Sequence, residues 1–131
     1  MNNLFILAFM LFMHIIADYN VQGCLANMKQ KTWWIDQCDN LNVGFAKYKN
    51  DYKMALVMHS FSWAFLIMLP IFIADGFNLS LLGFWGLVWN TVFHYFIDDF
   101  KANDHSINLV QDQIFHIIQI VVTFVCWILF A

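Results

Sequence analysis

Four long apolar segments, separated by clusters of charged and polar residues, divide this sequence. They span residues 4–17, 54–74, 79–97 and 114–131. A helix needs roughly 17–25 apolar residues to cross the hydrocarbon core of a bilayer. The last three segments satisfy this requirement directly, and the first does so if its helix continues past Asp18. The pattern predicts membrane-spanning helices at approximately 3–22, 53–74, 79–100 and 110–131.

Composition agrees with a membrane protein. Of the 131 residues, 62% are hydrophobic and 11% are charged, against about 45–50% and about 25% in soluble domains. A small soluble domain could not bury this much apolar surface. We therefore expect one all-α domain, residues 1–131, folded as a four-helix transmembrane bundle with the lipid bilayer as its partner. Six lysines, no arginine and a net charge of −3 argue against binding to nucleic acid.

The first apolar segment has a second interpretation, as the core of a secretory signal. The residues before it, Met-Asn-Asn, carry no positive charge, and no small-x-small cleavage pattern follows. We therefore favour a membrane-spanning helix for this segment.

The lysines predict the orientation in the membrane. Five of the six lie between the first two helices: Lys29, Lys31, Lys47, Lys49 and Lys53. The third connection carries Lys101, and the second carries none. The positive-inside rule places the lysine-rich connections in the cytoplasm. This predicts a multi-pass protein of the cytoplasmic (inner) membrane, with cytoplasmic residues 23–52 and both termini on the other side. Trp33 and Trp34 among these lysines indicate a segment at the level of the lipid headgroups.

Histidines and aspartates recur at one end of the predicted bundle. Three pairs have a four-residue spacing: His14 and Asp18, His94 and Asp98, and, in reverse order, Asp112 and His116. The reversal is what an antiparallel neighbour requires if like groups are to lie at the same depth. Residues four apart share one helix face, and polar residues of membrane helices face other helices. The pairs, with His59 near the start of the second long helix, are expected to converge.

Imidazoles and carboxylates at one depth suit a divalent transition metal, for which we favour zinc over manganese or iron. The candidate ligands are His14, Asp18, His59, His94, Asp98, Asp112 and His116. Seven ligands exceed one tetrahedral shell, which leaves two metals, or one metal with outer carboxylates, as alternatives. A metal-bound water would be the nucleophile of a hydrolase, with Asp18 or Asp98 as general base and Lys101 as an anion clamp.

Other readings use the same residues differently. A proton or ion pathway, in a transporter or channel, also places ionisable groups inside a bundle. The cluster could also serve helix packing, or hold a structural metal in a non-enzymatic bacterial or phage membrane protein. A pathway needs polar groups through the whole depth, but beyond Asn90 and Thr123 the helices are almost entirely apolar. This favours a one-sided site. His105 lies in a predicted loop and is not included.

The polar residues also resemble a family pattern: His-x-x-x-Asp-x-x-x-Gln, then His, then His-x-x-x-Asp-x-x-Lys, then Asp-Gln-x-x-His. Here these elements are residues 14–22, His59, residues 94–101 and residues 112–116. The pattern is similar to that of a domain of unknown function in small integral membrane proteins of bacteria and phages. Its His-x-x-x-Asp pairs also look like those of proteins described as membrane-bound metal-dependent hydrolases. The resemblance implies a metal site; it carries over no reaction.

Overall fold

The computed structural model describes residues 2–78 and 80–130, so the predicted helix boundaries at residues 79 and 131 lie outside the described residues. The described part contains helices and no strand, which confirms the predicted all-α class. Its helices are α1 (Asn3–Ile15), the π-helical segment η1 (Ile16–Val21), α2 (Leu25–Met28), α3 (Lys31–Asn40), the short 3₁₀ segment η2 (Phe45–Lys47), α4 (Asp51–Ala74), α5 (Leu81–Ala102) and α6 (Leu109–Phe130).

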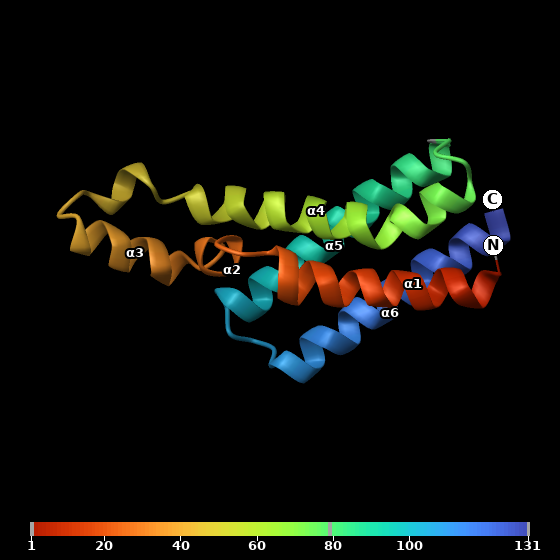
Figure 1. Ribbon diagram of the computed structural model, residues 1–131. Helices are drawn as coiled ribbons and strands as arrows, with labels where there is room; N and C mark the ends of the chain where they lie inside the picture. The colour runs from red at the N-terminus through yellow and green to blue at the C-terminus, as the bar shows by residue number, and fades with distance from the viewer. Residues whose placement is uncertain (1, 79, 131) are drawn as a thin grey trace.

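The four long helices α1, α4, α5 and α6 run alternately up and down (Figure 1). α1 packs on α4 and α6, while α5 packs on α4 and α6, and the α4–α5 interface is the most extensive. Both termini lie at the same end of the bundle (Figure 1). The apolar core fills the half nearer the termini, where Ile6, Met10, Ile67, Ile71 and Ile120 are buried against one another. The opposite half is the one that holds the polar cluster.

Three segments are long and apolar enough to cross a membrane: Asn3–Val21, Asp51–Ala74 and Leu109–Phe130. Three of the predicted membrane-spanning helices therefore have the length and apolar composition that a span requires. α5 is as long as α6, but its buried polar residues Asn90, His94 and Asp98 lower its hydropathy. Its outer face is nevertheless apolar, with Trp85, Trp89, Phe93 and Phe96 exposed along it.

α4 and α5 come close together because the α5 face toward α4 is small. A Cβ added at Gly86 would lie 2.9 Å from the Met68 Cε of α4, so only glycine fits without moving that side chain. Ser80 begins α5 by accepting a hydrogen bond from the Gly83 amide at 3.0 Å, as N-cap serines do.

The connection between η1 and α4 is folded and extends beyond the end of α1 (Figure 1). Trp34 stacks on Tyr48 with an interplanar angle of 10° and donates a hydrogen bond to the Met28 carbonyl at 2.7 Å. The Asn103 side chain joins this connection to the end of α5, accepting from the Lys31 amide at 2.7 Å and donating to the Lys29 carbonyl at 3.1 Å. Its predicted position at the headgroup level stays a prediction.

Candidate metal centre

The end of the first long helix is widened where it reaches the polar cluster. α1 gives way to the π-helical segment η1 at Ile16, and Asp18 lies within that segment, buried. Segments of π-helix are rare and occur frequently at functional sites. Here the four-residue spacing still brings His14 Nδ1 and Asp18 Oδ2 to 3.6 Å from each other. The Gln22 side-chain amide donates to the main-chain carbonyl of Asp18 and supports the turn.

All seven predicted ligands lie in one buried cluster formed by the four long helices. They are joined by contacts within 4 Å, through His14–Asp18, Asp18–His59, His59–Asp98, His94–Asp98, Asp98–His116 and His116–Asp112. None of their side chains is more than a tenth exposed. Asp98 contacts His59, His94 and His116, and Asp18 contacts His14, His59 and His94, so each of these two carboxylates contacts three of the four histidines.

Two groups within this cluster have the geometry to hold a metal ion. Asp18, His59 and His94 form one, and His94, Asp98 and His116 form the other, with the ligand atoms of each group within 4.8 Å of one another. His94 belongs to both groups. Its Nε2 lies 3.1 Å from His59 Nε2, and its Nδ1 lies 3.2 Å from His116 Nδ1.

Several buried polar atoms of the cluster have no hydrogen-bond partner among the described residues. Asp18 Oδ1, Asp112 Oδ1 and His116 Nε2 are in this position. His116 Nε2 and Asp112 Oδ1 lie 3.3 Å from each other, whereas Asp18 Oδ1 is 3.7 Å from His59 Nε2 and 3.8 Å from His94 Nε2. A buried polar atom left unsatisfied costs about 1–3 kcal/mol. Coordination to a cation would satisfy such atoms, and the donor set of imidazole nitrogens and carboxylate oxygens is the one that zinc accepts.

The remaining two predicted ligands, His14 and Asp112, lie beside the two groups and outside both. His14 Nδ1 accepts a hydrogen bond from Trp63 Nε1 at 2.9 Å, and its Nε2 lies 3.1 Å from Gln113 Oε1. Both ring nitrogens are therefore engaged. Asp112 accepts from Gln113 Nε2 at 3.0 Å, and its Oδ1 lies 3.3 Å from His116 Nε2. Residues in such outer positions orient the ligands of a metal.

Two lysines close the cluster at its outer end. Lys29 Nζ donates to Asp98 Oδ2 at 2.6 Å, and Lys101 Nζ donates to Asp112 Oδ2 at 2.7 Å. The partner of Lys101, a predicted anion clamp, is thus a carboxylate of the cluster. The pairing of Lys29 with Asp98 had no sequence signal, because the two residues lie 69 positions apart.

Trp63 is the functional neighbour that sequence reasoning missed. It is completely buried, and its indole stacks on the His94 ring with centroids 4.1 Å apart and planes 16° apart. Together with its hydrogen bond to His14, this contact fixes the orientation of two of the four imidazoles. Its position four residues after His59, on the same face of α4, is a signal that could have identified it.

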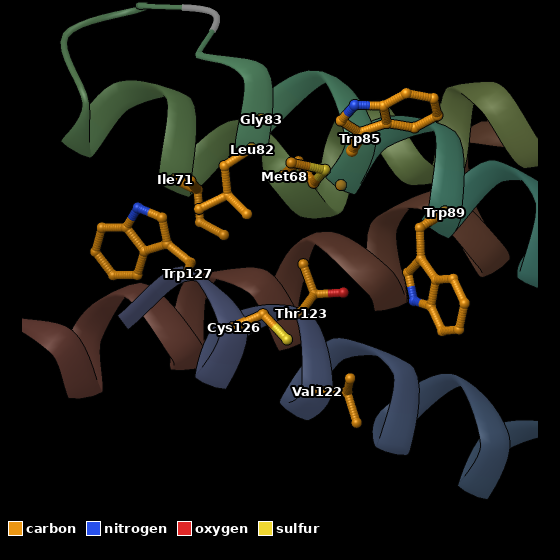
Figure 2. A pocket seen from close by; sticks show the side chains of 11 residues that line it. Met68, Ile71, Leu82, Gly83, Trp85, Trp89, Val122, Thr123, Cys126 and Trp127 are labelled. Carbon is orange, nitrogen blue, oxygen red and sulfur yellow. The ribbon is translucent and has the colours of Figure 1, made fainter. Parts of the chain in front are cut away.

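Polar contacts between the helices continue one step deeper than the cluster. Asn90 Nδ2 donates to Thr123 Oγ1 at 2.9 Å, and Gln119 Nε2 donates to Asn90 Oδ1 at 3.0 Å. On the terminal side of this network lies a cavity of about 410 Å³ with an almost wholly apolar lining, including Trp85, Trp89 and Trp127 (Figure 2). The cavity is lined by none of the seven clustered residues.

A smaller cavity of about 290 Å³ lies at the cluster end, and its lining includes Lys29, Asp98 and Lys101. Of the seven candidate ligands, Asp98 lines this cavity.

Comparison with protein-family models, curated proteins and solved structures finds no match to this chain. The family resemblance of the polar motifs accordingly stays a prediction, and the case for this site depends on its geometry.

Proposed function

We propose that this chain is a metal-dependent hydrolase of the cytoplasmic membrane that acts on a lipid-linked phosphate or ester at the cytoplasmic leaflet. In this proposal α5 is the fourth membrane-spanning helix, the connection of residues 23–52 is cytoplasmic and the termini lie on the opposite side. The observation that carries it is the pair of overlapping groups of buried His and Asp ligand atoms, each within 4.8 Å, contributed by all four long helices or their continuations.

The residues of the cluster divide into ligands and supporting groups. His94, Asp98 and His116 would supply the three nitrogen and oxygen ligands of a catalytic zinc site, which keeps its fourth position for water. A bound divalent ion makes its water acidic enough to yield hydroxide near neutral pH and polarises a phosphoryl or carbonyl oxygen. Asp18, whose Oδ1 has no hydrogen-bond partner among the described residues, would be the general base that accepts the proton of that water.

The charge balance favours one ion over two. Three carboxylates, of Asp18, Asp98 and Asp112, face two ammonium groups, of Lys29 and Lys101, so the cluster with neutral imidazoles carries one formal negative charge. One divalent ion changes the formal charge of the cluster to plus one, and two divalent ions would change it to plus three. Because a buried net charge is costly unless compensated, a single ion with an anionic ligand is the arrangement that these residues balance best.

Access to the cluster is one-sided. Asp98 lines the cavity at the cluster end, so water and a polar headgroup can reach a candidate ligand from there. On the other side, beyond the Asn90–Gln119–Thr123 network, the described core consists of apolar side chains such as Met10, Ile67 and Phe124. A proton or ion transporter needs polar groups across the full depth of the membrane, and this core does not offer them.

The test is metal content together with hydrolysis. The protein purified in detergent is expected to retain about one zinc per chain, held with one coordination position open for water. It is also expected to hydrolyse p-nitrophenyl phosphate esters or a short-chain p-nitrophenyl ester. Asp18→Asn should abolish hydrolysis and leave most of the zinc bound. Failure to bind zinc or manganese even after addition would refute the proposal. Bound zinc without hydrolysis of any ester would instead support the structural-metal alternative.

A further inference from the structure

We propose that the cavity at the cluster end binds the phosphate group of a ligand, and that this binding is coupled to occupation of the metal centre. The inference deepens the proposed function, on which it rests, because it names the chemical group that the substrate would present. The inference is drawn from the residues that line the cavity and from the charged groups among them. The residues concerned are Gln22, Lys29, Gln30, Asp98, Lys101 and His105.

The cavity contains hydrogen-bond donors suited to an oxyanion. Each lysine ammonium has three N–H donors, and the structure gives each of the two a single hydrogen bond among the described residues, to Asp98 and to Asp112. The side chain of Lys29 is only 14% exposed and that of Lys101 is 36% exposed. Two partly shielded ammonium groups on one small cavity form a site in which charge-assisted bonds to phosphate oxygens are strong.

The backbone holds Lys29 in place before any ligand arrives. Lys29 is the C-cap residue that follows α2, and its carbonyl accepts a hydrogen bond from Asn103 Nδ2 at 3.1 Å. The next amide but one, that of Lys31, donates to Asn103 Oδ1 at 2.7 Å. This bidentate bridge fixes α2 against the end of α5, so little conformational freedom is lost on binding.

Charge makes binding of the phosphate depend on the metal. Without an ion, and with its imidazoles neutral, the cluster is formally negative by one charge, which opposes an incoming anion. A divalent ion reverses the sign. Coordination of Asp98 by that ion would also weaken its bond to Lys29, since the carboxylate cannot give its full charge to both. The freed Lys29 ammonium would then be available to the phosphate oxygens in the cavity.

One further atom favours a ligand that also carries a hydroxyl group. Gln22 Oε1 is buried and has no hydrogen-bond partner among the described residues, and Gln22 contributes to the cavity wall. An amide oxygen repels a phosphate oxygen and accepts a hydrogen bond from a hydroxyl or from a protonated phosphate oxygen. The cavity, at about 290 Å³, lies at the lower end of the range for small-ligand sites, which suits a headgroup rather than a whole lipid.

The experiment measures the binding of inorganic phosphate to the full chain in neutral detergent by equilibrium dialysis. Two samples are compared, one loaded with zinc and then cleared of unbound zinc, and one stripped of metal. Zinc should tighten phosphate binding about tenfold or more, and phosphate should tighten zinc binding by the same factor, because the coupling is reciprocal. Lys29→Gln and Lys101→Gln should each weaken phosphate binding about tenfold, the value of one charge-assisted bond. Lys31→Gln is the matched control, since that exposed lysine does not line the cavity.

Two results would overturn the inference: equal phosphate affinity with and without zinc, or unchanged affinity in both Lys29→Gln and Lys101→Gln. Lys29→Arg, which keeps the charge, serves if Lys29→Gln does not fold. Zinc content measured on the same samples separates the proposals, because zinc uptake without phosphate binding refutes only this inference. A second arm uses nanodiscs of phosphatidylcholine with added phosphatidic acid. Displacement of phosphate by that lipid assigns the site to a headgroup, and lack of displacement assigns it to soluble phosphate.

Discussion

Replacement of His94 by alanine is the most informative perturbation, because this residue belongs to both ligand groups. His94→Ala leaves neither group complete, whereas His59→Ala leaves one intact and His116→Ala leaves the other. A structural zinc site is worth about 10–16 kcal/mol, or about 2.5–4 kcal/mol for each of four ligands. Loss of one ligand therefore lowers zinc affinity roughly a hundredfold to a thousandfold. We expect this loss in His94→Ala and a smaller loss in each of the other two variants.

The assay is competition for zinc against a chromophoric chelator in detergent, with elemental analysis of the purified protein. Asn90→Ala is the control: Asn90 is also fully buried on α5, one turn away, and hydrogen-bonds Thr123 and Gln119. Its loss should cost about 1–3 kcal/mol in unfolding through unsatisfied partners, with zinc retained. Zinc affinity in His94→Ala no lower than in His59→Ala and His116→Ala would refute the reasoning. Metal loss in the control would attribute the effect to misfolding.

Four other outcomes follow from the same contacts. Lys29→Gln should lower the free energy of unfolding of the metal-free protein by up to about 3–5 kcal/mol, the cost of breaking a buried ion pair. Zinc should restore part of this loss, and a loss that zinc leaves unchanged would contradict the pairing. Bound zinc should be released as the pH falls below about 6.5, where imidazoles take up protons and stop binding metal; retention at pH 5 would contradict histidine ligation. With the native cysteines replaced, a cysteine at position 78 should react with an impermeant reagent from outside cells, and one at position 42 should not; the reverse pattern would invert the orientation. Gly86→Ala should change the free energy of unfolding by less than about 1 kcal/mol, because the atom it meets, Met68 Cε, ends a flexible side chain and alanine favours the helix; a loss of several kcal/mol would show that Met68 cannot move.

The all-helical class and the positions of the three longest helices could be predicted because the hydrophobic pattern is simple. Long apolar segments leave few alternatives to helices in a bilayer, and α4, α5 and α6 lie where the apolar runs are. The break within the first helix, where α1 becomes the π-helical η1, left no mark in hydrophobicity, since it changes backbone hydrogen bonding and not composition. The folded connection was equally hidden. Its contacts, such as Trp34 with Tyr48, depend on pairs that no periodicity relates.

Helical geometry predicted that the seven residues come together, but it did not predict which of them contact one another. The four-residue spacing puts each pair on one helix face, and the antiparallel order of the helices puts the pairs at one depth. Both effects follow from the backbone alone, so they predict the convergence of His14, Asp18, Asp98 and His116. Which of them face one another depends on the rotation and packing of each helix, set by side chains such as Trp63. The sequence therefore could not predict which residues form the ligand groups and which lie outside them, nor that Lys29 pairs with the cluster.

Energetics give a final reason to regard the cluster as functional. Buried ionic networks are often replaceable by apolar residues with no loss of stability, or with a gain of about 1–4 kcal/mol. Within a bundle surrounded by lipid, ionisable side chains are costly to insert and are rare for that reason. A packing role would also be expected to satisfy the hydrogen-bonding atoms it buries, yet Asp18 Oδ1 lacks a hydrogen-bond partner among the described residues. Stability alone accounts for neither the buried charge nor this unsatisfied oxygen, whereas the proposed cation would account for both.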